Sequence, residues 1–465
     1  MRDERKGMKG LTINSVAKAC GGELFWNDGN SEQEITGVVI DSRKIEEGNL
    51  FIATKGERVD GHTFIKSAFE KGCAAVICEN LPEKSGPCIL VKDCFKALKD
   101  IAQYYREQLS VKVIGITGSV GKTSTKEFIA GVLAEKYNVL KTLGNFNNEV
   151  GLPLTVLSIR EEHEVAVLEM GISHFGEMHR LSKIAKPDIC VITNIGQCHL
   201  EFLGDRDGIL RAKTEIFDFL SDNGLVCLNG DDDKLNTIHA VAGRKPIRYG
   251  KSKDFDVYAT DLKDNGLLGS EAIIHARLDE IGVIIPIPGI HMVYNALAAT
   301  AVGLLLNLTM EQIAHGIKNV SSVAGRSNIV ETSKYILIDD CYNANPVSMK
   351  SAVDLLSTAK GRKVAILGDM FELGEDEDFL HKEIGKYAVK KQIDTILCTG
   401  ILSKNMYDGG ILANRESKKS EIRWFQTKNE LLVNLADILK DGDTVLIKAS
   451  HGMGFSEVVD ILEKD

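Results

Sequence analysis

A glycine-rich segment, Thr117-Gly-Ser-Val-Gly-Lys-Thr123, has the residue types of a phosphate-binding loop. It follows an apolar run at 111–116 that is typical of a buried strand, and it precedes a helical pattern at 126–137. In such a strand–loop–helix unit, backbone N–H groups and the helix N-terminus face the phosphates. Lys122 would reach the terminal phosphates, and the Thr123 hydroxyl would bind Mg²⁺. The segment therefore predicts a protein that binds a nucleoside triphosphate.

The loop departs from the strict pattern, because G-x-x-x-x-G-K-[ST] requires glycine where Ile116 stands. Glycines lie instead at 115, 118 and 121. A chance Gly-Lys-Thr after a strand would explain these residues without any ligand. However, Gly118 and Gly121 bracket the turn, and the flanks have the periods of a strand and a helix. We therefore expect a variant phosphate loop.

Three further residues could do chemistry, and two of them follow predicted strands. Glu169 ends the apolar run 165–169, and His199 comes shortly after the run 189–194. Ligands of α/β sheets gather at the carboxyl ends of strands. Glu169 fits a Mg²⁺ ligand beside Thr123 and equally a strand-end capping acid. His199 alone also fits a structural histidine, and Lys213 alone fits a solvated helix lysine.

Polar residues also gather near residue 325 and beyond it. Arg326 is either a surface arginine or a phosphate clamp that domain closure delivers. The run Asp339–Pro346 follows a predicted strand, and it could cap a helix or contact a ribose or phosphate. The segment 144–153 is dense in amides and glycines, which suits a loop that contacts a sugar or peptide.

The length of 465 residues predicts about three domains at ~150 residues each. Residues 1–107 mix short strands and helices, which predicts a small α/β N-terminal domain. Residues 108–325 alternate strand and helix, which predicts a central domain with a mostly parallel sheet. An antiparallel insert is expected at 249–288. Residues 326–465 alternate again, which predicts a C-terminal Rossmann-like domain.

Bulk composition narrows the class of protein. The net charge of -10 argues against a nucleic-acid partner. The ten cysteines include no C-x-x-C pair, which favours reduced cytosolic thiols. The charged N-terminus is unlike a signal peptide, and the apolar run at 296–306 is too short to span a bilayer. We expect a cytoplasmic, monomeric protein that binds small molecules and does not insert into membranes.

Together these motifs resemble the Mur ligases, the ATP-dependent amide-forming enzymes of peptidoglycan precursor synthesis. The resemblance covers nearly the whole chain, and the family phosphate loop accounts for the departure at Ile116. The other matching motifs, in family order, are Glu169-Met-Gly, His199-Leu-Glu, Ala212-Lys-Thr-Glu-Ile-Phe217, His291-x-x-x-Asn295, Gly325-Arg326 and Asp340-x-Tyr-Asn-Ala-Asn-Pro346.

Within the family, four stretches resemble the members that add D-alanyl-D-alanine to a UDP-N-acetylmuramoyl tripeptide. They are Asp41-Ser-Arg43, 145–154, Tyr342-Asn-Ala-Asn-Pro346 and 367–374. The tripeptide-forming members usually carry a Thr-Thr-Pro loop and an Asp-Asn-Pro-Arg segment, and neither occurs here. The family often has Lys-Gly-Ser-Arg near the C-terminus, whereas this chain has Lys448-Ala-Ser-His451, which leaves the role of His451 open.

The resemblance also implies roles for individual residues. For ATP it implies Thr117, Gly118, Ser119, Val120, Gly121, Lys122, Thr123 and Ser124, with Asn295 at adenine, Arg326 near the γ-phosphate and Asp340 at the ribose. For two Mg²⁺ ions it implies Thr123, Glu169, His199 and a carbamylated Lys213; Lys122, Glu169, His199 and Lys213 are the expected catalytic residues. For the other substrates it implies Ser42, Arg43, Asn147, Asn148, Asn343 and Asn345.

Two alternatives remain. One is a sister amide ligase, either a tripeptide-forming Mur ligase or an enzyme of folylpolyglutamate type. The other is a non-catalytic nucleotide-binding scaffold that kept the fold. The intact set of Lys122, Thr123, Glu169, His199 and Lys213 speaks against the scaffold, since a degenerate protein is expected to have lost some of them.

Overall fold

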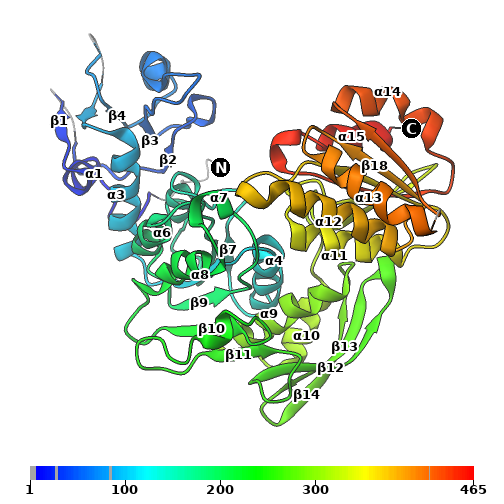
Figure 1. The fold of residues 1–465 in the computed structure, drawn as a ribbon. Helices are drawn as coiled ribbons and strands as arrows, with labels where there is room; N and C mark the ends of the chain where they lie inside the picture. The colour runs from blue at the N-terminus through cyan, green and yellow to red at the C-terminus, as the bar shows by residue number, and fades with distance from the viewer. Residues whose placement is uncertain (1–6, 27–29, 83–85, 418, 465) are drawn as a thin grey trace.

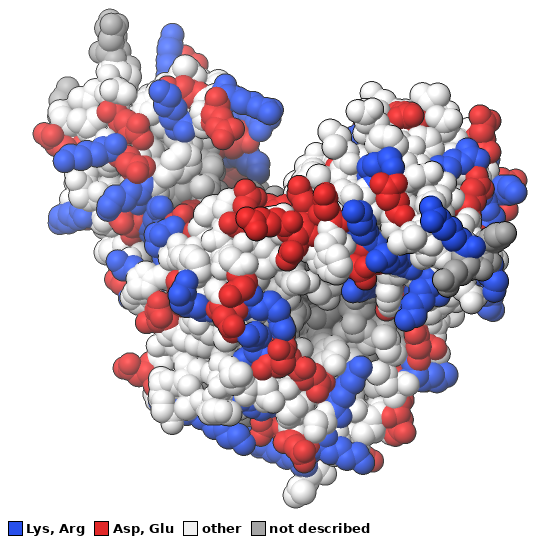
Figure 2. Space-filling view, viewed as in Figure 1, with Lys and Arg blue, Asp and Glu red and all other residues white. Residues whose placement is uncertain are grey.

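The computed structural model describes residues 7–26, 30–82, 86–417 and 419–464. The described chain forms three sheets that follow one another in sequence, and we call the parts built on them the N-terminal, central and C-terminal units (Figure 1). Figure 2 shows a hollow surface between the N-terminal and C-terminal units, with acidic side chains gathered along its floor. Every helix in the described residues is too short or too polar to cross a lipid bilayer.

The N-terminal unit has a five-stranded sheet in the order β1-β5-β4-β3-β2. Among the strand pairs of the described residues in this sheet, only β1–β5 is antiparallel. The strands are β1 (Glu23–Phe25), β2 (Gly37–Val39), β3 (Asn49–Ile52), β4 (Ala75–Cys78) and β5 (Cys88–Leu90). The helices are α1 (Ile13–Cys20), α2 (Ile65–Glu70) and α3 (Cys94–Glu107).

The central unit has a nine-stranded sheet in the order β14-β13-β12-β11-β10-β9-β6-β8-β7. It is parallel from β7 through β12, and β12–β14 form the expected antiparallel insert. The strands are β6 (Lys112–Thr117), β7 (Val139–Lys141), β8 (Val165–Glu169), β9 (Ile189–Ile192), β10 (Leu225–Asn229), β11 (Ile247–Gly250), β12 (Val257–Asp264), β13 (Ser270–Ala276) and β14 (Asp279–Ile285).

Helices cover both faces of the central sheet, because successive residues of its buried strands point into two separate apolar clusters. Ile114 and Ile116 of β6 pack with helices α4 (Lys122–Leu133), α9 (Val293–Leu305) and α10 (Met310–Lys318). Val113 packs on the other face with α5 (Gly151–Val156), α6 (Glu177–Ala185) and α8 (Arg206–Thr214). The short α7 (Leu200–Leu203) follows β9. This two-sided burial is the expected pattern for a parallel sheet.

The C-terminal unit has a six-stranded sheet in the order β15-β16-β20-β17-β18-β19, parallel except for the β15–β16 pair. Its strands are β15 (Asn328–Glu331), β16 (Ile336–Asp339), β17 (Lys363–Gly368), β18 (Thr395–Thr399), β19 (Glu421–Phe425) and β20 (Thr444–Lys448). Its helices are α11 (Pro346–Ser357), α12 (Glu377–Lys390), α13 (Ser403–Ser417), α14 (Lys428–Ile438) and α15 (Ser456–Leu462). The doubly wound α/β prediction for this part is confirmed.

The predicted boundaries fall in connections between elements, at the end of α3 and between α10 and β15. The first boundary does not separate two cores. Residues of α1 and α3 share one apolar cluster with α5 and α6 of the central unit. The Tyr105 hydroxyl of α3 also donates to the carbonyl oxygen of Ile159 at 2.7 Å. The N-terminal unit therefore rests on the central unit through a continuous packed contact.

Helix α13 forms despite two adjacent glycines, Gly409 and Gly410. Two glycines in a row lower helix propensity, so the segment lacks a clear helical pattern. In the structure these glycines let α12 and α13 approach closely. A Cβ on Gly409 would lie 2.2 Å from the carbonyl oxygen of Lys382, and one on Gly385 would lie 1.9 Å from that of Met406. Tertiary packing thus compensates for the weak local preference.

Candidate active site

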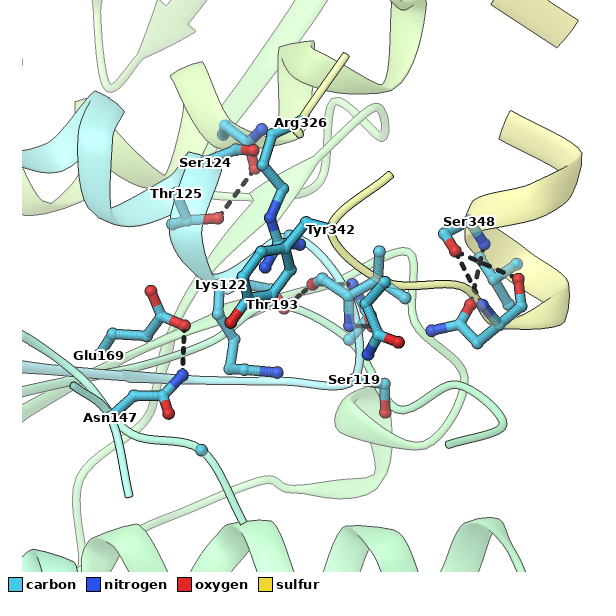
Figure 3. Close-up of a pocket in the computed structure, with 18 of the residues that line it drawn as sticks. Ser119, Lys122, Ser124, Thr125, Asn147, Glu169, Thr193, Arg326, Tyr342 and Ser348 are labelled. Carbon is cyan, nitrogen blue, oxygen red and sulfur yellow. Dashed lines mark hydrogen bonds between the residues drawn. The ribbon is translucent and has the colours of Figure 1, made fainter. Parts of the chain in front are cut away.

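A cavity of about 790 Å³ lies where the central and C-terminal units meet. One wall comes from the loop between β6 and α4, the ends of β8 and β9, and the start of α9. The opposite wall comes from the segment 340–352 and from Lys448 at the end of β20. Figure 3 shows Lys122 and Glu169 of the first wall beside Arg326 and Tyr342. The carboxyl ends of strands from two sheets therefore face one space, as expected for ligand sites in α/β proteins.

The loop before α4 needs its glycines for two different reasons. Gly118 has φ +151° and Gly121 has φ +82°, a region that side chains with a Cβ rarely adopt. A Cβ on Gly118 would also lie 1.9 Å from the Thr193 hydroxyl oxygen. Helix α4 begins at Lys122, four residues earlier than the pattern at 126–137 predicts, so the unpaired N–H groups of its first turn border the cavity. The loop has the form of an anion-binding site.

Residues at the end of β9 hold this loop in place. The side chain of Asn194 accepts from the backbone N of Val120 at 3.0 Å and donates to the Val120 carbonyl at 2.9 Å. The Thr193 hydroxyl donates to the same carbonyl at 2.6 Å. Ser119 donates from its backbone N to the carbonyl of Asn194 at 3.0 Å. The loop conformation is thus fixed by the neighbouring strand.

Lys122 is the cation of this wall. Its ammonium donates to the carbonyl oxygen of Gly118 at 2.9 Å. Burial lowers the pKa of Lys122, and the nearby Glu169 carboxylate opposes that shift. No carboxylate lies within ion-pair distance of Lys122 in the described part of the chain. Its charge is therefore available to an anionic ligand.

Glu169 has one occupied and one open oxygen. Its Oε1 accepts from the side-chain amide of Asn147 at 2.8 Å. Its Oε2 is buried and has no hydrogen-bond partner among the described residues, and the ammonium of Lys126 stays 3.8 Å away. A buried carboxylate oxygen without a partner is costly unless a ligand satisfies it. Because carboxylate oxygens are among the donors that Mg²⁺ prefers, the open Oε2 of Glu169 fits a ligand of such an ion.

His199 and Lys213 differ in their access to the cavity. His199 lines the cavity and has φ +51° at the start of α7. Its Nδ1 contacts the Glu372 carboxylate at 2.5 Å. Lys213 on α8 is buried and is not part of the cavity wall, and burial lowers its pKa to about 8. Groups of three or more His, Cys, Asp or Glu side chains suited to a metal are absent from the described residues.

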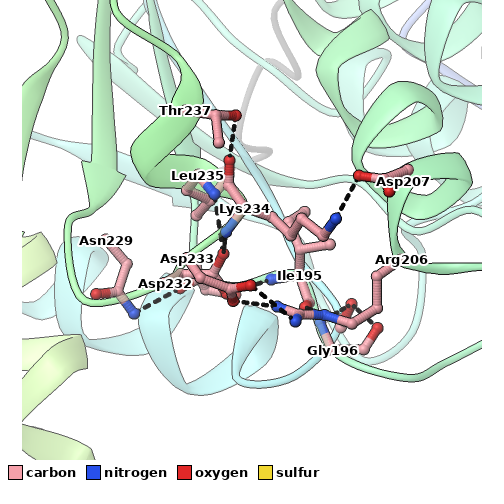
Figure 4. A network of polar contacts seen from close by, with 12 residues as sticks. Ile195, Gly196, Arg206, Asp207, Asn229, Asp232, Asp233, Lys234, Leu235 and Thr237 are labelled. Atoms are coloured by element: carbon pink, nitrogen blue, oxygen red, sulfur yellow. Dashed lines mark hydrogen bonds and ion pairs between the residues drawn. The ribbon is translucent and has the colours of Figure 1, made fainter.

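A second layer of contacts supports the segment that leads to His199 (Figure 4). Asp232 accepts from the backbone N of Ile195 at 2.8 Å. Arg206 donates to the Ile195 carbonyl at 2.8 Å and pairs with Asp233. The loop after β10 and the start of α8 thereby hold the segment after β9 from both sides.

The opposite wall is built from ion pairs and stacking. Asp340 accepts from the Lys448 ammonium at 2.6 Å and from the backbone N of Ser327 at 3.0 Å. The guanidinium of Arg326 lies 4.0 Å from the centre of the Tyr342 ring. Arg326 follows Gly325, whose φ is +76° and whose backbone N donates to Asp339 at 2.6 Å.

Two asparagines complete this wall. The side chain of Asn345 caps helix α11 by accepting from the backbone N of Ser348 at 2.9 Å, which is one of the two roles that the sequence left open for the run before Pro346. The Asn343 carbonyl accepts from Lys448 at 2.9 Å.

The start of α9 forms the third side of the cavity. Asn295 accepts from the Thr125 hydroxyl at 2.8 Å and donates to the Met292 sulfur at 3.1 Å, so it joins α9 to α4. Tyr294 donates to Asp231 at 2.9 Å. Burial lowers the pKa of His291, which favours a neutral imidazole here.

Family models match most of the chain in three successive segments. The Mur ligase family catalytic domain matches residues 34–112, the Mur ligase middle domain matches 116–303, and the Mur ligase glutamate ligase domain matches 325–451. The chain belongs to the Mur ligase family.

Individual Mur ligases are similar over nearly the full length. The UDP-N-acetylmuramoyl-tripeptide–D-alanyl-D-alanine ligase of Bacillus subtilis (strain 168) is 39% identical, with 97% of this chain and 98% of the relative covered. A crystal structure of MurF from Acinetobacter baumannii is 32% identical with a TM-score of 0.89, covering 99% of this chain and 100% of that one. The MurF ligase from Thermotoga maritima in complex with ADP is 31% identical with a TM-score of 0.80, covering 92% and 97%.

The cavity of this Mur ligase brings together most of the residues singled out in the sequence. Those that line it are Ser119, Val120, Gly121, Lys122, Ser124, Asn147, Asn148, Glu169, His199, Asn295, Arg326, Asp340, Asn343 and Asn345. Thr117, Gly118, Thr123 and Lys213 are not part of its wall, and neither are Ser42 and Arg43 of the N-terminal unit, where Arg43 pairs with Asp41. The roles of all these residues stay predictions.

Sequence reasoning did not single out Thr193 and Asn194, which hold the phosphate loop, or Lys448 as the partner of Asp340. The signal for the first two was present. Both stand at the end of the run 189–194, next to the loop strand, where parallel strands bring their carboxyl ends together. The Asp340–Lys448 pair had no local signal, because it joins two strands far apart in sequence.

Proposed function

We propose that this Mur ligase joins D-alanyl-D-alanine to a UDP-N-acetylmuramoyl tripeptide at the expense of ATP. The observation that carries the proposal is the full-length similarity to relatives named for this reaction, together with a phosphate loop that opens onto a cavity between two units. The fold of the ADP complex from Thermotoga maritima supports ATP as the nucleotide.

In the proposed reaction a carboxylate oxygen of the tripeptide attacks the γ-phosphorus of ATP. The bond between the β–γ bridging oxygen and phosphorus breaks, ADP leaves, and an acyl phosphate forms. The amine of D-alanyl-D-alanine then attacks the acyl carbon, inorganic phosphate leaves, and the nitrogen loses a proton to give the amide. The main barrier is the approach of one anion to another, so positioning and positive charge supply most of the rate.

Residues of both walls fit these needs. Lys122 and the N–H groups at the start of α4 would hold the β- and γ-phosphates. Arg326 would stabilise the charge on the transferred phosphoryl group, as arginines do in phosphoryl transfer. Asn147 and Asn148 would contact the muramoyl or peptide part, and Ser42 with Arg43 the UDP part. Asp340 would contact the ribose and Asn295 the adenine. Each would use the hydrogen-bonding positions that its contacts within the protein leave free.

Mg²⁺ would neutralise charge on the ATP phosphates and on the developing acyl phosphate when it is bound. Thr123 and Glu169 would hold a first ion, in agreement with the open Oε2 of Glu169. His199 and Lys213 would hold a second ion. An ammonium group repels a cation, so this role requires Lys213 to be carbamylated.

Carbamylation needs a neutral amine, which attacks the carbon of CO₂ and releases one proton. Because burial lowers the pKa of Lys213 to about 8, the neutral amine is available near neutral pH, unlike in a solvated lysine. We expect activity to fall when bicarbonate is stripped at neutral pH and to recover on its return. Isotopically labelled bicarbonate should give a carbamate resonance that Lys213→Arg abolishes. An unmodified amine in fully active enzyme would contradict this.

The test of the reaction is phosphate release from ATP with Mg²⁺ and UDP-N-acetylmuramoyl tripeptide, with and without D-alanyl-D-alanine. Dipeptide-dependent release with a UDP-muramoyl pentapeptide product, identified by mass spectrometry, is the expected result. Release only with a single amino acid and a shorter acceptor would move the protein to a sister ligase. Absence of substrate-dependent turnover in folded protein would favour the non-catalytic scaffold.

A further inference from the structure

A carboxylate from the C-terminal unit reaches a histidine of the central unit. Glu372 lies in the turn after β17, and its Oε2 contacts Nδ1 of His199 at 2.5 Å. The two residues come from different sheets and are 173 positions apart in the sequence. The other ring nitrogen, Nε2, has no hydrogen bond to any described residue, and His199 lines the cavity.

The backbone around this contact is arranged to bring the two side chains together. Both partners adopt the left-handed region, His199 with φ +51° and Glu372 with φ +62°. Residues other than glycine seldom do so unless the surrounding structure imposes it, and such positions cluster at functional sites. The conformation therefore marks the contact as a constrained one.

The chain on either side of the contact is packed as well. Leu200, next to His199, packs against the apolar core of the C-terminal unit. Gly374, with φ +66°, lies so close to α7 that a Cβ would be 3.5 Å from the backbone N of Glu201. The contact is therefore part of a docked surface between α7 and the turn at 374–376, not a chance meeting of two exposed side chains.

A histidine that donates from one ring nitrogen to a carboxylate keeps the lone pair of the other nitrogen free. Metal-binding histidines are commonly arranged in this way, since the carboxylate fixes the tautomer and ring orientation and raises ligand basicity. Here Nδ1 is held by Glu372, Nε2 has no hydrogen bond to a described residue, and the histidine lines the cavity.

We propose that Glu372 is a positioning residue that orients His199 as a metal ligand, so that docking of the C-terminal unit completes the second metal site. This inference rests on the proposed function, in which His199 binds Mg²⁺. Metal affinity and docking of the C-terminal unit are then linked: whatever separates Glu372 from His199 weakens metal binding, and bound metal favours the docked arrangement by the same factor.

The test uses Mn²⁺ as the probe, with the full-length enzyme and a non-hydrolysable ATP analogue. Mn²⁺ binding is followed by electron paramagnetic resonance, and the electron spin-echo nitrogen signal reports imidazole bound to the metal. The single variants are Glu372→Ala, Glu372→Gln and His199→Ala. The double variant combines His199→Ala with Glu372→Ala. Glu375→Ala is the matched control, because this exposed acid has no ion pair or hydrogen bond to the described residues. Thermal melting checks that each variant is folded.

We expect Glu372→Ala to weaken Mn²⁺ binding at one site about tenfold or more and to reduce the nitrogen signal, the usual scale for loss of such a partner. Glu372→Gln should recover much of the affinity, since its amide oxygen still accepts from Nδ1. Glu375→Ala should match the wild type. In the His199→Ala background, Glu372→Ala should add nothing.

Two results would show that Glu372 does not position His199, even if His199 is a metal ligand. One is that His199→Ala weakens binding but Glu372→Ala changes neither affinity nor nitrogen signal. The other is that Glu372→Ala weakens binding equally with and without His199. If His199→Ala itself has no effect, His199 is not a ligand, and both the metal role of His199 and the inference are wrong. Dipeptide-dependent ligation is measured separately and would stand in each case.

Discussion

The phosphate-loop wall and the opposite wall of the cavity are held by different interactions. On the first wall, hydrogen bonds from Thr193 and Asn194 fix the loop backbone, and Lys122 has no carboxylate partner among the described residues. On the second wall, Asp340 and Lys448 pair with each other, and Arg326 stacks on Tyr342.

The first wall is thus preorganised to bind a ligand, whereas the contacts of the second wall hold the C-terminal unit together. A cation fixed by backbone carbonyls keeps its charge for an incoming anion, and it costs no reorganisation during the reaction. A buried ion pair largely cancels its own field and holds two strands together instead. Mutations in the two walls should therefore differ in whether they reduce turnover or stability.

The largest effect is expected from Lys122→Ala. Removing this cation should lower kcat by roughly 10²–10³-fold, because it stabilises phosphate charge that develops in the transition state. The melting temperature should fall little or rise, since the variant no longer holds a half-buried ammonium group without a carboxylate partner. Steady-state phosphate release and thermal melting measure the two effects, with the exposed Lys183→Ala as the control. Near-normal turnover would show that the loop is wrongly assigned.

Lys448→Met should instead reduce stability more than turnover. It leaves Asp340 buried without its partner, which typically costs about 3 kcal/mol of unfolding free energy. The side chains of Lys448 and Asp340 are only 3% and 12% exposed, so water cannot replace the lost pairing easily. Calorimetry should show a lower transition for the C-terminal unit. The double variant Asp340→Asn/Lys448→Met should recover part of the loss, and a further loss would contradict a simple ion pair.

Asn194→Ala tests whether the first wall is preorganised by β9. Two hydrogen bonds to Val120 are lost, at about 1 kcal/mol each. We expect the KM for ATP to rise roughly tenfold with a smaller change in melting temperature. Nucleotide titration of the variant measures this directly. An unchanged KM would mean that Thr193 and the glycines hold the loop without Asn194.

The smallest effect is expected from Tyr342→Leu. A cation–π contact contributes about 0.5–1 kcal/mol at a partly exposed site, so loss of the ring should lower kcat/KM for ATP by about two- to fivefold. Tyr342→Phe keeps the ring face and should recover most of the loss. If Phe behaves like Leu, the tyrosine hydroxyl rather than the stacking supports Arg326.

Features that depend on strand order could be predicted from the sequence, and features that depend on tertiary contacts could not. Glu169 at the end of β8 and His199 in the segment after β9 were correctly expected near the loop, because parallel strands bring their carboxyl ends to one edge. The start of α4 was placed too late, since its first turn, Lys-Thr-Ser-Thr, has no apolar period. The pairs Asp340–Lys448 and His199–Glu372 join distant segments and left no local pattern.

The position of Arg326 has a consequence for catalysis. This residue sits near the end of the connection between α10 and β15, just after Gly325 with its φ of +76°. A rotation of the C-terminal unit about that connection would carry the guanidinium with it. The net positive charge around the phosphates would then depend on the angle between the units, and a half-rotated enzyme would lack one cation. Such a protein would hold its nucleotide in an electrostatically incomplete site, with little tendency to transfer the γ-phosphoryl group to water.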